Sequence, residues 1–209
     1  MHRPTAEDLD FLLPGVLHQF GNLLLTIQGH ASTLEPDCVE RAKQAILGAT
    51  DRAGRTLRLL HELGGDSASV PANACELLEQ LVELVRVPVR ELHHSIRSKD
   101  IAARRPTLVQ AGPFTRRFLA ALRLLLAHLP QGQHGTINVD LSAAESLATV
   151  RLRFEPQAGA LPFPIATREL LTALERAVPG HEAWTKCPSQ GACIELAFPL
   201  GAVSHEAEA

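Results

Sequence analysis

The residues best suited to carry out a reaction lie in one stretch near the N-terminus, Gly15–Gly29, which reads GVLHQFGNLLLTIQG. It contains His18 and, one helical turn later, Asn22. A neutral imidazole is a nucleophile near pH 7, and a carboxamide four residues away on the same helical face can bond to it. We therefore expect His18 to be within reach of a large partner, and Asn22 to orient the imidazole.

The apolar residues around this stretch predict the helix that presents it. They recur at steps of three and four, apart from a skip at His30, and are Leu9, Leu13, Val16, Phe20, Leu23, Ile27 and Leu34. This spacing is typical of a long amphipathic helix, expected from about Ala6 to Leu34 and bent at Pro14. The alternative is a helix that begins at Pro14. His18 points roughly opposite Val16, so burial of the seam leaves the imidazole exposed.

A second helix, from about Cys38 to Leu63, is predicted by the same kind of spacing. Its seam is Val39, Ala42, Ile46, Ala49, Ala53, Thr56, Leu60 and Leu63. The short connection makes the pair an antiparallel hairpin. One hairpin does not bury both of its seams, so a twofold dimeric four-helix bundle is the expected assembly.

The sequence GVLHQFGNLL at residues 15–24 resembles the H-box of sensor histidine kinases, which usually reads GVAHDFNNLL. The resemblance implies that His18 carries the phosphoryl group within a dimeric helical bundle. Gln19 stands where the family has an acidic residue that helps remove the proton; glutamine can orient an imidazole but cannot act as a base. Residues 51–60 are also similar to the second bundle helix of these kinases.

Beyond a linker expected at residues 66–71, helical and strand-like patterns alternate. Helices are expected at 74–91, interrupted near Pro88, and at 113–128 and 166–178; strands are expected at 95–97, 107–109, 136–141, 148–154, 182–185 and 192–198. This order predicts an α/β sandwich whose sheet is covered by helices on one face. It resembles the ATP-binding domain of histidine kinases, above all at the terminal strand pair, 179–199.

The nucleotide chemistry of that family is missing from the corresponding segments. Residues 118–128 hold no Asn for magnesium, and 154–160 read FEPQAGA where the family has D-x-G-x-G. Pro162 and Pro164 stand where the glycines of the phosphate-binding lid are expected. We therefore expect a degenerate domain that keeps the fold without binding ATP.

Composition narrows the possible partners. The chain is 45% hydrophobic and 21% charged, with a net charge of −3, and no window reaches the roughly 18 apolar residues of a membrane span. We expect a cytoplasmic protein without nucleic-acid or membrane partners. The four cysteines lack a C-x-x-C pair and suggest buried, reduced thiols. His93 and His94 are expected to be extended and to point to opposite faces, which disfavours a metal site.

These observations predict an α+β protein with a hairpin at residues 1–65, the linker at 66–71, the sandwich at 72–201 and a disordered tail at 202–209. The leading hypothesis is a histidine phosphotransferase that exchanges phosphoryl groups with response-regulator receiver domains. It binds no cofactor itself, because the receiver supplies Mg²⁺. Partner contacts are expected at Gly15 and at Arg52, Arg55 and Arg58. The alternative for the three arginines is a basic face that is exposed to solvent and binds no partner. The alternatives are a non-catalytic pseudokinase adaptor, a receiver phosphatase using Asn22, and an active kinase with an aberrant pocket.

Overall fold

The structure is a computed structural model of the 209-residue chain. It describes residues 6–32, 38–64, 71–99, 107–129, 132, 134–144, 147–157, 172, 185–186 and 193–199. The chain divides into two compact units, Met1–Ser67 and Ala68–Ala209.

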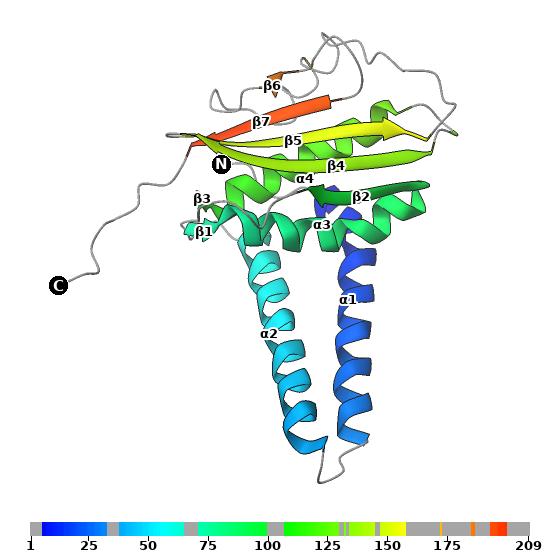
Figure 1. Ribbon diagram of the computed structural model, residues 1–209. Helices are drawn as coiled ribbons and strands as arrows, with labels where there is room; N and C mark the ends of the chain where they lie inside the picture. Colours follow the sequence, from blue (N-terminus) through cyan, green and yellow to red (C-terminus); the bar gives the residue numbers. More distant parts are fainter. Residues whose placement is uncertain are drawn as a thin grey trace, which may run out of the picture. The chain divides into compact units, whose positions relative to one another are not determined.

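The first unit is an antiparallel hairpin of two long helices (Figure 1). Helix α1 spans Ala6–Ser32 and helix α2 spans Val39–Gly64. Helix α1 runs through Pro14 without interruption, so the alternative start at Pro14 is wrong. Glu7 and Asp8 occupy its first turn, where carboxylates oppose the positive end of the helix dipole. The hairpin predicted from the two seams is confirmed.

The buried face of α1 is rotated about the helix axis relative to the face that the sequence pattern predicted. Val16 and Leu23 are buried as expected, but Leu12, which lies outside the predicted seam, is fully buried. Leu9 and Leu13 are instead 40% and 51% exposed. Because apolar residues occupy two adjacent faces of α1, a three-and-four spacing fits either face, and only the position of α2 selects one.

Helix α2 packs through small side chains. Ala42, Ala49, Thr56 and Leu63 of the predicted seam are buried, and Leu59 joins them. Val39 is 48% exposed, so the seam does not extend to the start of the helix. Alanines allow the two backbones to approach closely, but they interlock less than larger side chains do. The hairpin is therefore held mainly by non-directional apolar contact.

The second unit contains a mixed β-sheet, shown in green to red in Figure 1. Its described strands are β2 (His94–Lys99), β4 (Gly135–Ala144), β5 (Leu147–Pro156), β6 (Thr185–Lys186) and β7 (Cys193–Pro199). They are ordered β2-β4-β5-β7-β6; β2 and β4 are parallel, and the other neighbours are antiparallel. Along β4 and β5, alternate residues such as Ile137, Val139 and Leu152 are buried, which defines a single core face.

Helices α3 (Ala74–Glu91) and α4 (Ala111–His128) lie on the same side of this sheet (Figure 1). Phe114 and Phe118 of α4 are almost fully buried. A two-stranded ribbon of β1 (Pro71–Asn73) and β3 (Leu108–Gln110) lies at the start of the two helices. The predicted sandwich, with helices on one face, is confirmed.

Several local expectations are corrected or lie outside the described residues. Pro71 belongs to strand β1 rather than to a linker, and α3 passes through Pro88 without a break. The linker residues 66–70, the lid prolines, nearly all of the helix expected at 166–178 and the tail 202–209 are not among the described residues. No helix in the described part of the chain has the length and apolar character needed to span a bilayer.

Candidate functional site

The imidazole of His18 is exposed on α1, as the sequence pattern predicted. Its Nε2 atom lies 3.1 Å from the side-chain nitrogen of Asn22, which is also exposed. Gly21, next to this pair, has open space around the position that a Cβ would take. The pair is therefore open to approach by a partner.

The hydrogen bond between these side chains fixes which ring nitrogen carries the proton. A carboxamide nitrogen only donates, so Nε2 of His18 accepts with its lone pair. In the neutral ring the proton must then be on Nδ1. Asn22 in turn accepts a hydrogen bond through its backbone oxygen from the Thr26 hydroxyl at 2.8 Å. In this tautomer the ring nitrogen that carries the lone pair, and is therefore the nucleophilic atom, is Nε2.

Gln19 does not turn toward the imidazole. Its Oε1 accepts a hydrogen bond of 3.0 Å from the hydroxyl of Thr56, which is 4% exposed on α2. The Thr56 hydroxyl also lies 3.2 Å from the Arg52 carbonyl oxygen of its own helix. Sequence reasoning placed Thr56 in the apolar seam and gave it no polar role, because its partner is 37 residues away.

The other residues predicted to meet a partner differ in their accessibility. Gly15 is buried, so the described structure does not offer it as a contact surface. Arg52 and Arg58 are exposed, whereas Arg55 is partly exposed and forms an ion pair of 2.6 Å with Asp51. Such surface pairs contribute little stability, so Arg55 can exchange Asp51 for an anionic partner.

Helical geometry places His18 and two of these arginines on the same side of the hairpin. Successive residues of an α-helix are rotated by about 100° about the helix axis. Around α1, His18 therefore lies about 140° from the centre of the line of buried side chains. Helix α2 runs antiparallel to α1. The same rotation per residue places Arg52 and Arg55 on the side of the hairpin that carries His18, and places Arg58 about 60° beyond Arg55 around α2. His18, Asn22, Arg52 and Arg55 form what we call the imidazole face.

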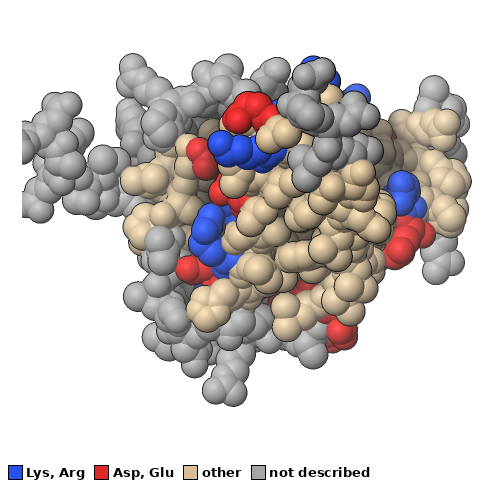
Figure 2. All heavy atoms as spheres, turned by 90° about the horizontal axis from the view of Figure 1, so that it is seen from below, with Lys and Arg blue, Asp and Glu red and all other residues tan. Residues whose placement is uncertain are grey.

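The opposite side of the hairpin is apolar. Leu13, Leu17 and Leu24 of α1 are 51%, 64% and 64% exposed and lie within about 40° of one another around the helix. Leu57 of α2, which is 56% exposed, lies on the same side, whereas Leu47, which is 53% exposed, points away from α1. We call Leu13, Leu17, Leu24 and Leu57 the apolar face. Figure 2, a view from below, shows a broad area of residues other than Lys, Arg, Asp and Glu, with charged residues of both signs around it.

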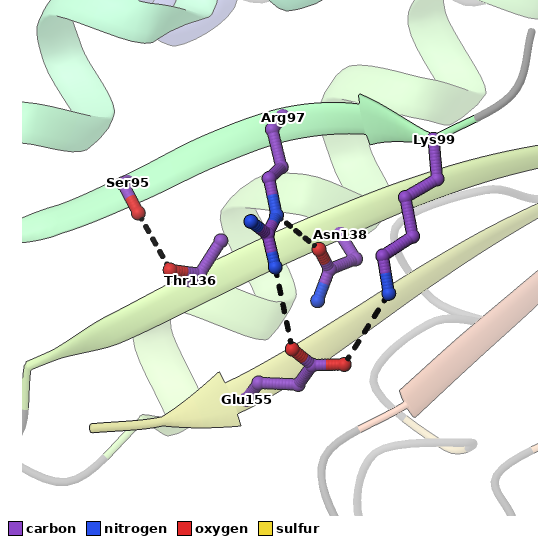
Figure 3. Close-up of polar contacts among 6 residues, drawn as sticks. All are labelled: Ser95, Arg97, Lys99, Thr136, Asn138 and Glu155. Carbon is purple, nitrogen blue, oxygen red and sulfur yellow. Dashed lines mark hydrogen bonds and ion pairs between the residues drawn. The ribbon is translucent and has the colours of Figure 1, made fainter. Parts of the chain in front are cut away.

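The second unit carries a polar cluster on the side of its sheet away from the core (Figure 3). Arg97 donates from Nε to Oδ1 of Asn138 at 2.7 Å, and its guanidinium lies 3.7 Å from Glu155. Lys99 approaches the same carboxylate at 3.8 Å, and Ser95 bonds Thr136 at 2.8 Å. Two cations thus share one carboxylate across β2, β4 and β5. This arrangement ties strands together and offers no free nucleophile.

Three histidines gather where β2 and β4 begin. His94 is 9% exposed, its Nδ1 has no hydrogen-bond partner, and its ring packs edge-on against Phe154. Burial lowers the pKa of His94, and the nearby His134 and His93 lower it further. His93 is not extended as expected: its φ of 64° places it in the turn after α3, and only His94 enters the strand. Across the described residues, no group of three or more His, Cys, Asp or Glu is placed to hold a metal ion.

Helix α4 contains the segment in which the resemblance to histidine kinases implies an Asn that binds magnesium. Its side chains are apolar, hydroxyl or cationic, and none carries a carboxylate or a carboxamide. Phe118, Leu122 and Leu125 fill its inner face with 0% exposure. This helix therefore supplies none of the oxygen ligands that a nucleotide-bound Mg²⁺ prefers.

No protein-family model and no curated protein matches the sequence. Among solved structures, the chain is similar to the histidine kinase AdeS of Acinetobacter baumannii, at 10% identity and a TM-score of 0.46, over 90% of this chain and 98% of that one. It is similar to the mycobacterial sensor histidine kinase MprB at 15% identity and a TM-score of 0.39, over 63% and 97% of the two chains. A third similar structure is the histidine kinase ThkA in complex with the response regulator TrrA, at 12% identity and a TM-score of 0.45, over 92% and 62%. All three proteins are histidine kinases, the family that the H-box resemblance named.

Proposed function

We propose that this chain is a histidine phosphotransferase that exchanges a phosphoryl group between His18 and the aspartates of response-regulator receiver domains. The observation that carries the proposal is the exposed imidazole of His18, whose Nε2 lone pair is directed at the amide of Asn22. An exposed, neutral and oriented imidazole is the group that such a transfer requires from this partner.

In the proposed step, the Nε2 lone pair of His18 attacks the phosphorus of an aspartyl phosphate. A nitrogen–phosphorus bond forms while the phosphorus–oxygen bond breaks, and its electron pair stays on the receiver carboxylate. The Nδ1 proton compensates the charge that develops on the ring and can pass to solvent. Asn22 leaves Nε2 as the phosphorus approaches. The Mg²⁺ bound by the receiver neutralises the transferring oxygens, so the bundle needs to bring no metal of its own.

The imidazole face supports docking of an anionic partner. Arg52 is exposed, and Arg55 is bound to Asp51 only by a surface ion pair. Two guanidinium groups beside His18 attract the acidic, phosphate-bearing surface of a receiver and speed its encounter. The chain as a whole carries a net charge of −3, so this attraction is local to the imidazole face.

We also propose that two copies associate through the apolar face. Leu17 and Leu24, each 64% exposed, are large apolar side chains on the side of the hairpin opposite His18. Their burial in a dimer removes apolar surface from water, while His18 stays accessible on the other side.

The second unit is proposed to act without ATP. Support comes from α4, which lacks a carboxylate or carboxamide, and from the sequence FEPQAGA at residues 154–160. The phosphoryl group would then come from a receiver instead of from a nucleotide. In accord with this, addition of MgATP should not raise the thermal unfolding midpoint, since only a ligand that binds the folded state does so.

The deciding experiment mixes the chain with radiolabelled, phosphorylated receiver domains and follows the label over time. His18→Ala is the test variant, and His61→Ala, at an exposed histidine of α2, is the matched control. Label is expected on the wild type and on His61→Ala in an acid-labile form, and it should be absent from His18→Ala. Capture by His18→Ala would reject the proposal.

Two other outcomes identify the alternatives. Loss of label from the receiver as free phosphate, without capture, would identify a receiver phosphatase. In that case Asn22→Ala should abolish the effect, because its exposed carboxamide would orient the attacking water. Unchanged label on every receiver tested would identify a non-catalytic adaptor.

A further inference from the structure

We propose that Thr56 is a positioning residue for His18 and acts through Gln19. This inference rests on the proposed phosphotransfer function. It starts from a polar contact in an otherwise apolar part of the hairpin: the Thr56 hydroxyl donates to Gln19 Oε1 at 3.0 Å, and Gln19 adjoins His18 in the chain.

The contact is suited to fix the rotation of α1 about its own axis. Thr56 is 4% exposed and lies in the line of buried side chains of α2 that includes Ala49 and Leu63. Apolar contacts with alanines resist separation of the helices but resist rotation or sliding only weakly, because they have no directional component. A hydrogen bond has a preferred distance and angle, so it selects one rotation.

Rotation of α1 matters because His18 lies well away from the helix axis. A turn of about 20° moves a side chain that is about 6 Å from the axis by roughly 2 Å. Displacement of a reacting group by about 1 Å can lower a transfer rate by about a hundredfold. Thr56 also keeps the Gln19 carboxamide on the α2 side, which leaves Asn22 as the bonding partner of Nε2.

The test compares Thr56→Val with Thr56→Ser in the full chain. Valine keeps the shape of threonine but lacks the hydroxyl, whereas serine keeps the donor. Thr50→Val is the matched control: the Thr50 hydroxyl bonds the Ile46 carbonyl of its own helix at 2.9 Å, so the same substitution there leaves α1 untouched. Circular dichroism confirms that each variant is folded.

We expect Thr56→Val to lower the maximal rate of phosphoryl transfer from a receiver by about tenfold or more, with little change in the receiver concentration at half-maximal rate. Thr56→Ser and Thr50→Val should transfer at close to the wild-type rate. Gln19→Leu should reproduce the loss, and the double variant Gln19→Leu with Thr56→Val should lose little more than either alone. Equal rates for Thr56→Val and the wild type would overturn the proposal.

A second measurement separates this proposal from the proposed function. The ¹⁵N and ¹H signals of the His18 ring report its surroundings without any receiver. They should shift in Thr56→Val and Gln19→Leu but not in Thr50→Val. If the wild type accepts no phosphoryl group, the proposed phosphotransfer function is rejected. Shifted ring signals in Thr56→Val would still support the proposal that Thr56 positions His18. Unchanged ring signals with normal transfer would reject positioning and leave phosphotransfer intact.

Discussion

At the scale of single residues, the two side chains that were expected to orient His18 make different contacts. Asn22 contacts the ring directly at 3.1 Å, whereas Gln19 is bound to Thr56 on the other helix. The sequence offered both side chains as orienting groups for the imidazole. The structure puts Asn22 in that position and gives Gln19 a contact with α2.

Replacement of Asn22 by alanine tests this direct contact. The hydrogen bond from Asn22 stabilises the form of His18 with its proton on Nδ1, and such a bond contributes about 1 kcal/mol. We expect Asn22→Ala to shift the ratio of the two neutral ring forms about fivefold toward the Nε2-protonated one, as measured from ¹⁵N shifts. Gln28→Ala, which removes an exposed carboxamide from the same helix, should leave the ratio unchanged. An unaltered ratio in Asn22→Ala would show that Asn22 does not set the tautomer.

At the scale of secondary-structure elements, the start of β2 combines a turn with a buried titratable group. His93 lies in the turn after α3 with a φ of 64°, and His94 follows it into the core beside Phe154. The first residue of the neighbouring strand is Gly135, where any Cβ would collide with the Phe154 ring. The close packing leaves the Nδ1 atom of His94 without a hydrogen-bond partner.

This packing predicts a pH dependence of stability. Burial holds the pKa of His94 below its usual 6.5, so the unfolded chain binds the proton more readily than the folded one. Stability contributed by neutral His94 is therefore complete above about pH 6.5 and is lost as the pH falls below that value, by at most about 1.4 kcal/mol per pH unit.

The measurement is the urea midpoint at a series of pH values from 7.5 to about 5. His94→Phe keeps a ring against Phe154 and removes the titrating group, so its midpoint should fall less than that of the wild type over this range. His61→Phe, at an exposed position, should follow the wild type. Parallel curves for the wild type and His94→Phe would contradict the role given to His94.

At the scale of the whole molecule, the hairpin has an imidazole face and an apolar face, for which we propose a receiver domain and a second copy as the respective partners. Leu17 and Leu24 lie on the apolar face, opposite His18. We expect Leu17→Glu together with Leu24→Glu to convert a dimer into a monomer, because burial of two carboxylates costs several kcal/mol per charge. Light scattering coupled to size-exclusion chromatography measures the mass.

Two controls sharpen this prediction. Leu25→Glu adds a charge at an exposed leucine of α1 that lies about 20° around the helix from His18, on the imidazole face, and should leave the mass unchanged. Helical content should be kept in the double variant, since both leucines are mostly exposed in the single chain. A wild type that is already monomeric, or a double variant that remains dimeric, would refute association through the apolar face.

Within the described residues, the sequence by itself determined helices α1 to α4, most strands and the exposed position of His18, because these depend on local periodicity and caps. Helix α3 is an example: Asn73 accepts a hydrogen bond from the Cys75 backbone at 3.0 Å, and the helix spans the predicted residues. Strand β1 was missed because three residues, Pro-Ala-Asn, carry no alternation.

The tertiary structure alone decided which of two adjacent apolar faces of α1 is buried, and thus that Leu12 is inside while Leu13 is exposed. It also decided that Gln19 bonds Thr56 rather than His18. Both outcomes depend on the position of α2 beside α1. Residues 37 apart in the chain meet only after the hairpin has closed, so no local pattern in the sequence records their contact.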